Sequence, residues 1–175
     1  GAHGLVAKGI ATPYEEVYNI PLILRVPGAR QSVEDRHTIT SLLDLAPTLL
    51  DYCGIPALPA AQGRSLRPVL DGTANPAEWQ DAYGEFFGQR FVYTQRITWH
   101  GEWKYVFNPG GIDELYHLSE DPLERINRAE DPACRDVLEE MCRRMWRKMA
   151  AIGDCSLYQT EYATLRTAPV GPGEA

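Results

Sequence analysis

Residues 131–153 read DPACRDVLEEMCRRMWRKMAAIG and predict a long helix. Asp131 is a favourable N-cap with Pro132 at the first helical position, and Gly153 suits the C-terminal end. Apolar residues recur along this stretch at helical spacing, namely Leu138, Met141, Met145, Met149 and Ile152. We interpret this stripe as a face that packs against a sheet. The alternative is a groove for a partner.

The segments that precede this helix predict the sheet. Residues 82–87, 91–99, 102–108 and 114–118 have strand-like composition and are separated by Gly, Asn and Pro turns. Trp99-His100-Gly101-Glu102 favours a hairpin turn. Short consecutive strands with tight connections predict an antiparallel sheet, and such a sheet needs cover on one face.

The first part of the chain has a different pattern. Pro21-Leu22-Ile23-Leu24-Arg25-Val26 predicts a buried strand of an α/β sheet covered on both faces. Residues 41–53 predict a helix that begins late because of Pro47, with Asp44 as N-cap. Its apolar residues at helical spacing are Leu42, Leu45, Leu49 and Cys53. Residues 64–70 predict a further short helix.

These patterns divide the chain into three parts. Residues 1–72 are predicted to belong to an α/β domain and residues 73–155 to a subdomain of antiparallel sheet plus helix. Residues 156–175 are a tail that is either disordered or lies along a neighbouring subunit. The fold class is therefore α/β, ending in a small antiparallel sheet packed against one long helix.

Composition excludes several function classes. The chain has 175 residues, a net charge of −7 and no Lys/Arg block, which argues against nucleic-acid binding. No apolar run approaches the roughly 20 residues that span a bilayer. The cysteines lack the CxxC spacing of zinc ribbons and redox motifs, so we interpret them as buried hydrophobes or inert surface thiols. They are Cys53, Cys134, Cys142 and Cys155.

Lys8 is the strongest candidate for chemistry. It lies in a glycine-rich loop that begins Gly1-Ala2-His3-Gly4 and continues through Lys8-Gly9 toward the predicted strand. A cation in such a loop, near a strand end of an α/β sheet, is well placed to meet an oxyanion.

The residues around Lys8 resemble the signature of the sulfatase family, in the alkaline phosphatase superfamily. The matching run is Gly4-Leu5-Val6-Ala7-Lys8-Gly9, then Tyr14-Glu15-Glu16, Ile20-Pro21-Leu22-Ile23 and Val26-Pro27-Gly28. The resemblance implies that Lys8 contacts the sulfate group of the substrate. It also implies that a metal-binding Asp-His or Asp-Asn pair lies just before Gly1.

The resemblance extends along the chain to Asp154. Its further motifs, in the order of the family, are residues 44–51, Gly54-Ile55-Pro56, Gly63-Arg64-Ser65-Leu66, Lys104-Tyr105-Val106, residues 114–118 and residues 121–127. The fold that this implies is the C-terminal part of the alkaline-phosphatase-like sulfatase fold. We therefore expect a fragment whose residues 1–72 complete a catalytic domain, an expectation that the start at Gly1 rather than Met supports.

Other parts of the family pattern are missing. The family nucleophile is a formylglycine made from Cys or Ser in a motif far upstream, and the sequence after Cys53 does not fit that motif. The implied metal, calcium by resemblance, would be held mostly by residues outside this chain. We therefore expect no turnover by the chain alone.

Two histidines are secondary candidates. His3 could line the anion pocket or donate a proton, or it could be a loop histidine held by backbone hydrogen bonds. His100, with Trp99 and Trp103, could form a wall of the substrate pocket, but sheet packing explains the tryptophans equally well. Glu15 and Glu16 could orient Lys8, and one of them could anchor the loop. We assign neither a catalytic role.

Three functions remain open at this point. The first is hydrolysis of a small anionic sulfate ester by the full-length protein, with this chain contributing Lys8 and the C-terminal subdomain. The second is a phosphonate monoester or phosphodiester hydrolase of the same superfamily. The third is a non-catalytic structural or oligomerisation module. The expected partners are the rest of the parent catalytic domain and possible further copies of the protein, and the cellular compartment is not predicted.

Overall fold

The computed structural model describes residues 2–4, 12–26, 28, 34, 38–88, 94–157 and 168–174. The chain forms two compact units. Unit 1 consists of Gly1–Pro21 and Tyr83–Ala175, and unit 2 consists of Leu22–Ala82. The division of the chain into domains at residue 72 stays a prediction.

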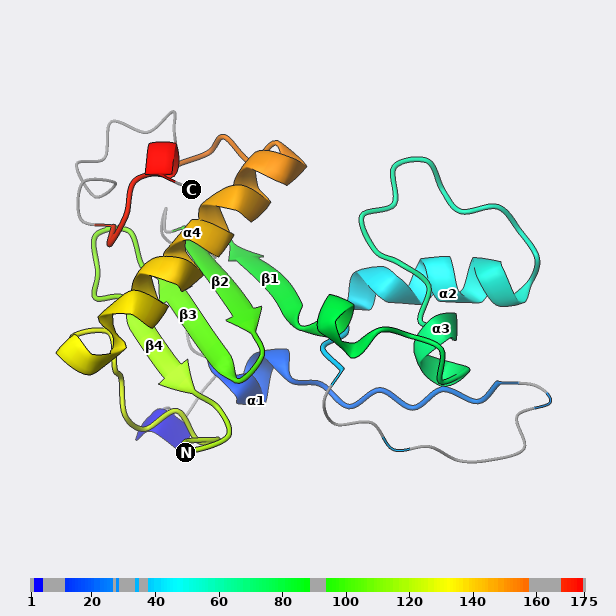
Figure 1. Cartoon of the computed structure of the whole chain (residues 1–175), viewed down its shortest axis with the longest axis horizontal. Helices are drawn as coiled ribbons and strands as arrows, with labels where there is room; N and C mark the ends of the chain where they lie inside the picture. The colour runs from blue at the N-terminus through cyan, green and yellow to red at the C-terminus, as the bar shows by residue number, and fades with distance from the viewer. Residues whose placement is uncertain are drawn as a thin grey trace. The chain divides into compact units, whose positions relative to one another are not determined.

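Unit 1 is built on a four-stranded sheet with the order β1-β2-β3-β4 (Figure 1). β3 runs antiparallel to both β2 and β4. Between β2 and β3 the chain turns at Gly101, whose φ of 56° lies in the left-handed region that tight hairpin turns need. The predicted sheet and hairpin are confirmed, although residues 91–93 of the second predicted strand lie outside the described residues. The strands are β1 (Asp81–Phe86), β2 (Gln95–His100), β3 (Trp103–Phe107) and β4 (Glu114–His117).

The predicted long helix is α4 (Arg135–Ile152), preceded by the short 3-10 helix η4 (Pro132–Cys134). The Asp131 side chain caps η4 by accepting a hydrogen bond from the backbone N–H of Ala133 at 2.9 Å. Gly153 ends α4 with a φ of 73°. Among the described residues, no helix is long and apolar enough to cross a membrane.

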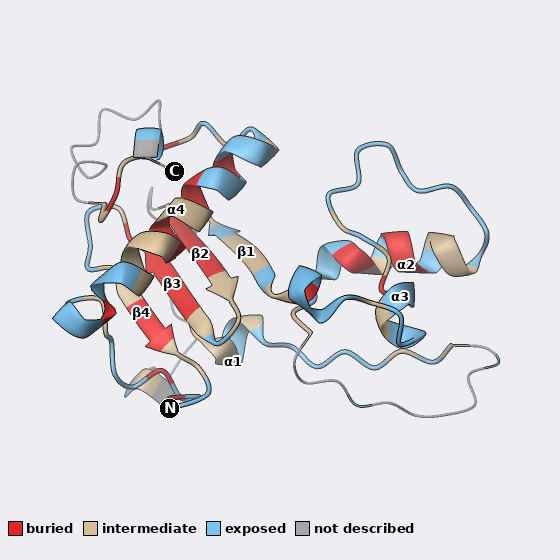
Figure 2. Cartoon of the chain, viewed as in Figure 1, coloured by how far each residue is buried: buried red, intermediate tan, exposed pale blue. Residues whose placement is uncertain are grey.

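One face of the sheet packs against α4 (Figure 1). The Trp146 ring meets the Phe107 ring edge-on, with centroids 5.8 Å apart. The methionines of the predicted stripe, Met141, Met145 and Met149, are therefore core, as predicted, and Figure 2 shows buried residues on the side of α4 that faces the sheet. Val170, which lies in the predicted tail of residues 156–175, belongs to the same core. The main buried residues of this core are Tyr105, Phe107, Leu115, Met141, Cys142, Met145, Trp146, Met149, Leu157 and Val170.

The opposite face of the sheet is covered by α1 (Glu15–Tyr18) and its flanking residues. Side chains alternate between the two faces of a strand, so Tyr105 points to α4 and Lys104 to the other side. There Lys104 contacts Glu15, and the Trp99 ring lies 5.5 Å from that of Tyr18. The sheet of unit 1 is thus covered on both faces, once by a long helix and once by a short segment from the start of the chain.

Unit 2 contains short helices. The Ser41 hydroxyl and the Asp44 carboxylate form a capping box at the start of η2, with Ser41 N–H donating to Asp44 at 2.9 Å. Asp44 also accepts from the backbone N–H of Arg64, so it joins the start of the helical region to the segment that leads to α3. The helices are η2 (Leu42–Asp44), α2 (Leu45–Tyr52), α3 (Arg67–Leu70) and η3 (Pro76–Trp79).

The predicted helix is present as η2 and α2, and of the apolar residues that predicted it, Leu42, Leu49 and Cys53 are exposed. Leu42 and Leu49 are 65% and 62% exposed, whereas Pro47 and Thr48 are the buried residues of α2. On the buried side of the helix, the Thr48 hydroxyl makes two hydrogen bonds. It donates to Asp44 O and accepts from Leu66 N–H, which turns that side of the helix toward α3.

The predicted buried strand at residues 21–26 is not observed. These residues have no assigned strand, and Ile23 is 93% exposed. A strand forms only when a neighbouring strand satisfies its backbone hydrogen bonds. Within the described part of this chain, no strand pairs with residues 21–26.

Candidate functional site

The described residues nearest to Lys8 in sequence are His3 and Gly4 on one side and residues 12–18 on the other. Lys8 itself lies outside the described residues, so its assignment stays a prediction. The candidate site is therefore built from the described residues on either side of Lys8 in sequence and from the residues of the sheet that hold them.

Lys104 is the centre of this site. Its side chain is fully buried, and its Nζ lies 2.9 Å from Glu15 Oε1 and 2.7 Å from Glu124 Oε1. The Nζ is also 5.2 Å from the centroid of the Trp99 ring, within cation–π range. A buried ammonium requires such partners, because an unpaired charge away from water is strongly unfavourable.

Glu15 anchors the start of the chain to this lysine. Its backbone N–H donates to Glu124 Oε2 at 2.6 Å, and its carboxylate accepts from Trp99 Nε1 at 2.8 Å. One residue thus contacts β2, β3 and the segment after β4. Of the two adjacent glutamates, Glu15 is held by these contacts, whereas Glu16 is exposed.

Glu124 reaches Lys104 from an unusual backbone position. Its φ of 49° lies in the left-handed region, which costs a residue with a side chain on the order of 1 kcal/mol or more. Its side chain is fully buried beside Lys104. Burial raises the pKa of the Glu124 carboxyl above its usual 4.5, and this effect outweighs the opposing effects of Lys104 and the Glu15 N–H. We call Glu15, Lys104 and Glu124 the ion triad.

His3 lies beside the same segment. Its ring stacks on Tyr14 with centroids 3.5 Å apart and planes 2° from parallel. Its Nε2 lies 3.8 Å from Glu16 Oε2. The structure therefore brings His3 together with the glutamate segment that follows Lys8, although a role for His3 in substrate binding stays a prediction.

His3, Glu16 and Glu124 also invite a test as metal ligands. Their ligand atoms lie within 4.8 Å of one another, and within the described ranges this is the one group of three that could surround an ion. The fit is poor, because Glu124 already accepts from the Lys104 ammonium and the Glu15 N–H. A divalent cation there would lie against a buried positive charge. We therefore do not assign the expected calcium to these residues.

His100, the other predicted histidine, lies at the end of β2 opposite Trp103 in the hairpin. Trp103 meets His117 edge-on at 4.5 Å and packs against the core, while Trp99 binds Glu15. The two tryptophans therefore serve sheet packing and loop anchoring. A role for His100 at a substrate pocket stays a prediction.

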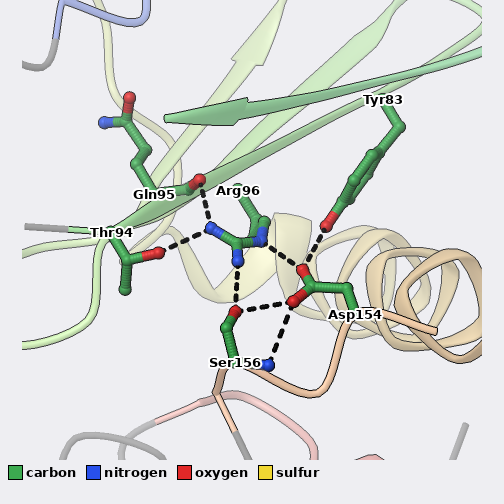
Figure 3. A network of polar contacts seen from close by, with 6 residues as sticks. All are labelled: Tyr83, Thr94, Gln95, Arg96, Asp154 and Ser156. Carbon is green, nitrogen blue, oxygen red and sulfur yellow. Dashed lines mark hydrogen bonds and ion pairs between the residues drawn. The ribbon is translucent and has the colours of Figure 1, made fainter. Parts of the chain in front are cut away.

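A second buried cation lies on the α4 face of the sheet (Figure 3). The fully buried Arg96 donates from Nε to Asp154 Oδ2 at 2.8 Å and from Nη2 to the Ser156 hydroxyl at 2.6 Å. Burial acts to raise the pKa of the Asp154 carboxyl, but the hydrogen bonds from Arg96 and Ser156 prevail and hold it below its usual 3.8. This network holds the chain that follows α4, and none of the residues drawn in Figure 3 is a candidate site residue.

Sequence patterns missed the ion triad. Lys104 and Glu124 lie in Lys104-Tyr105-Val106 and in residues 121–127, which supported only the family resemblance. A lysine between Trp103 and Tyr105 in an apolar strand was the available signal, because a buried lysine needs a carboxylate partner. The identity of that partner, 20 residues farther along the chain, has no local signal.

Comparison with known proteins adds independent information. The chain matches the family model described as N-sulphoglucosamine sulphohydrolase, C-terminal, over residues 1–151. It is 34% identical to a Delta 4,5-hexuronate-2-O-sulfatase of Bacteroides thetaiotaomicron, over 79% of this chain and 30% of that protein. It is 30% identical to arylsulfatase K of Danio rerio, over 71% of this chain and 25% of that protein.

Solved structures give the same picture. A 2-O GAG sulfatase superimposes with a TM-score of 0.62 at 28% identity, covering 67% of this chain and 26% of that one. The phosphonate monoester hydrolase of Agrobacterium radiobacter has a TM-score of 0.56 at 27% identity, covering 70% of this chain and 27% of that one. The chain spans less than a third of the length of each of these relatives.

Proposed function

Because this chain belongs to the sulfatase family of the alkaline phosphatase superfamily and has the fold of its C-terminal part, we propose that it completes a metal-dependent hydrolase of sulfate esters. In this proposal the full-length protein cleaves a small anionic ester, and the present chain supplies Lys8 and the subdomain of unit 1. The observation that carries it is the match of the family model to residues 1–151.

Lys8 is proposed to bind the sulfuryl oxygens of the substrate. A lysine ammonium neutralises the charge that these oxygens hold during displacement, and such preorganised charge stabilises a transition state strongly. The described residues on both sides of its loop support this role, because His3 and Glu15 are each held by a ring or ion contact. His3 and His100 are secondary candidates for lining the substrate pocket.

The rest of the catalytic machinery is proposed to lie in the parent protein outside this chain. It would include a formylglycine nucleophile and most ligands of a divalent metal, with calcium as the expected ion. When bound, that metal would stabilise negative charge at the reacting group. We therefore expect the isolated chain to show no turnover.

Unit 2 is proposed to lie against the rest of the parent catalytic domain. It exposes several large apolar side chains, which isolated soluble domains rarely gather in number. Burial of these side chains by the parent would also give residues 21–26 a strand to pair with. The exposed apolar residues of unit 2 include Leu22, Ile23, Leu42, Leu43, Leu49, Ile55, Leu58 and Leu70.

A phosphonate monoester or phosphodiester hydrolase is the second candidate. It is favoured by the structural match to the phosphonate monoester hydrolase of Agrobacterium radiobacter, which covers as much of this chain as the sulfatase match does. Sulfate and phosphonate esters present similar tetrahedral oxyanions to a lysine, so the residues of unit 1 give little indication of which ester is the substrate.

The deciding experiment compares three esters in the full-length parent protein. Hydrolysis of an aryl sulfate, a matched phosphonate monoester and a matched phosphodiester would be measured for wild type and Lys8→Ala. We expect the sulfate to be the best substrate and the variant to lose about 100-fold in kcat/KM. Activity confined to the phosphorus esters would replace the sulfatase proposal with the second candidate. Unchanged sulfatase turnover in the variant would remove Lys8 from the site.

A further inference from the structure

Residues 168–171, drawn in red in Figure 1, form a short segment that packs beside α4. The family model ends at residue 151, yet Val170 is buried in the core that α4 forms with the sheet. Ala168 packs against the same core, and the following η6 (Pro172–Glu174) contacts α4. The core of unit 1 therefore includes residues that lie beyond the match to the family.

The backbone of Val170 is bound to two successive turns of α4. Its carbonyl oxygen accepts a hydrogen bond from Trp146 Nε1 at 2.9 Å and one from Cys142 Sγ at 3.6 Å. Both donors are buried, and residues i and i+4 of a helix lie on the same side of it. Polar contacts thus fix the backbone of the segment, while apolar contacts hold its valine in the core.

Both described ends of the predicted tail lie on this one core. Leu157, the last described residue before residues 168–171, is buried in the same cluster as Val170. The chain therefore starts from this core after α4 and returns to it. Without residues 168–171, Cys142 and Trp146 would lose the carbonyl that they share and part of their apolar cover. Exposed apolar patches of this kind favour association with other protein surfaces.

We infer that residues 168–171 are a strap that folds back on their own chain, completes the core of unit 1 and closes this side of α4 to a second copy of the protein. The surface beneath the strap is apolar, with two side-chain donors aimed at one backbone carbonyl. The inference does not depend on which ester the full-length protein hydrolyses.

Cys142 reports whether the strap is in place. Its thiol is buried, and burial raises the pKa of this thiol, so we expect it to react slowly with an alkylating reagent. The exposed Cys53 and Cys155 provide internal references for the activity of the reagent. The experiment treats the folded full-length parent protein with iodoacetamide and measures alkylation of Cys142 over time by peptide mass spectrometry.

Val170→Asp should open the strap. We expect alkylation of Cys142 to become at least about 10-fold faster, because a carboxylate is strongly disfavoured in an apolar core. Gly171→Asp is the matched control, since it adds the same charge at the next residue, where nothing lies within 4 Å of a Cβ. Unchanged alkylation in Val170→Asp, or equal increases in the two variants, would overturn the strap.

A milder variant and urea separate local opening from global unfolding. Val170→Ala keeps the carbonyl and shortens the side chain, so alkylation of Cys142 should become about threefold faster. Opening of a short segment exposes little surface, so this increase should depend weakly on low concentrations of urea, whereas global unfolding responds steeply. A steep urea dependence, or no increase in Val170→Ala, would contradict the inference.

Dilution and sedimentation test whether the strap binds its own chain. In wild type, alkylation of Cys142 should be equal at about 0.1 and 10 µM protein, because a contact within one chain is independent of concentration. Faster alkylation at the lower concentration would show that a second copy supplies the segment, which would overturn the inference. At the higher concentration, Val170→Asp should sediment with a larger fraction of associated species than wild type and Gly171→Asp. Equal sedimentation of the three proteins would refute closure against a second copy.

Discussion

The two faces of the sheet in unit 1 are covered by different chemistry. On one face α4 contributes methionines and Trp146 to an apolar core, with the Arg96–Asp154 pair at its margin. On the other face a segment of a few residues is held by the ion triad at its centre. An apolar face accepts many helices of suitable spacing and volume. A buried lysine accepts only a segment that places a carboxylate beside its ammonium. We therefore infer that the ion triad fixes where the Glu15 segment lies on the sheet, whereas the α4 face mainly supplies stability.

One of the two largest effects is expected on the apolar face. Trp146→Ala removes a ring that is 1% exposed and loses its hydrogen bond to Val170 O at 2.9 Å. We expect the free energy of unfolding to fall by about 3–5 kcal/mol, as for other buried aromatic truncations. Urea unfolding of the parent protein would measure it, with the exposed Lys148→Ala as control. A loss below about 1 kcal/mol would show that α4 does not form the core of this unit.

Lys104→Met should lower the free energy of unfolding by about 3–5 kcal/mol at neutral pH, because it leaves the buried Glu124 carboxylate without its cation. Lys104 lowers the pKa of Glu124, so its removal raises that pKa further. A carboxyl with a raised folded pKa stabilises the fold below its unfolded pKa and loses this contribution as pH rises through the folded value. The loss of unfolding free energy caused by Lys104→Met should therefore be smaller at pH 5 than at pH 7.5 in urea titrations. A cost independent of pH would contradict the triad.

Asp154→Asn tests the opposite pH response on the α4 face. We expect a loss of about 1.5–3 kcal/mol at pH 7, typical of a hydrogen bond between charged groups. The lowered pKa of Asp154 gives stability that is present above its usual 3.8 and is lost as pH falls through the folded value. The unfolding curves of variant and wild type should converge only below about pH 4. Convergence near pH 5 would assign the effect to another group.

The smallest effect is expected for Gly84→Ala. A Cβ at Gly84 would lie 3.3 Å from Trp99 and from Tyr18, the rings that pack α1 on the sheet. We expect a loss of about 1 kcal/mol, since the rings must shift by a few tenths of an ångström. Gly171→Ala is the control, because nothing lies within 4 Å of a Cβ there. Equal thermal midpoints for the two variants would show that this packing is loose.

Periodicity predicted unit 1 well. The apolar stripe of α4, the Asp131 cap of the preceding η4 and the end at Gly153 follow from local rules, and the structure confirms them. The sulfatase fold prediction is likewise confirmed by the match to a 2-O GAG sulfatase. Local rules suffice here because each element is covered by partners within the same chain.

The same rules failed where partners are distant or absent. The spacing of Leu42 and Leu49 predicted the helix, but not which side of it is buried, which is the side where Thr48 hydrogen-bonds to Asp44 O and Leu66 N–H. Residues 21–26 predicted a buried strand, which forms only beside another strand. The pairing of Lys104 with Glu124 depends on which loop crosses the sheet, and no local pattern encodes that.

The ion triad also has a consequence for folding on the ribosome. The hairpins β2-β3-β4 and α4 form from residues near one another in sequence, whereas Glu15 must wait for Glu124, 109 residues later. At translation rates of roughly 5–20 residues per second, that interval lasts about 5–20 s. For most of that interval the segment carrying Glu15 lacks Lys104 as well, because Lys104 follows Glu15 by 89 residues. The segment that follows the proposed substrate-binding Lys8 would therefore stay unanchored until synthesis has passed Glu124, so activity would require the chain to be made at least that far.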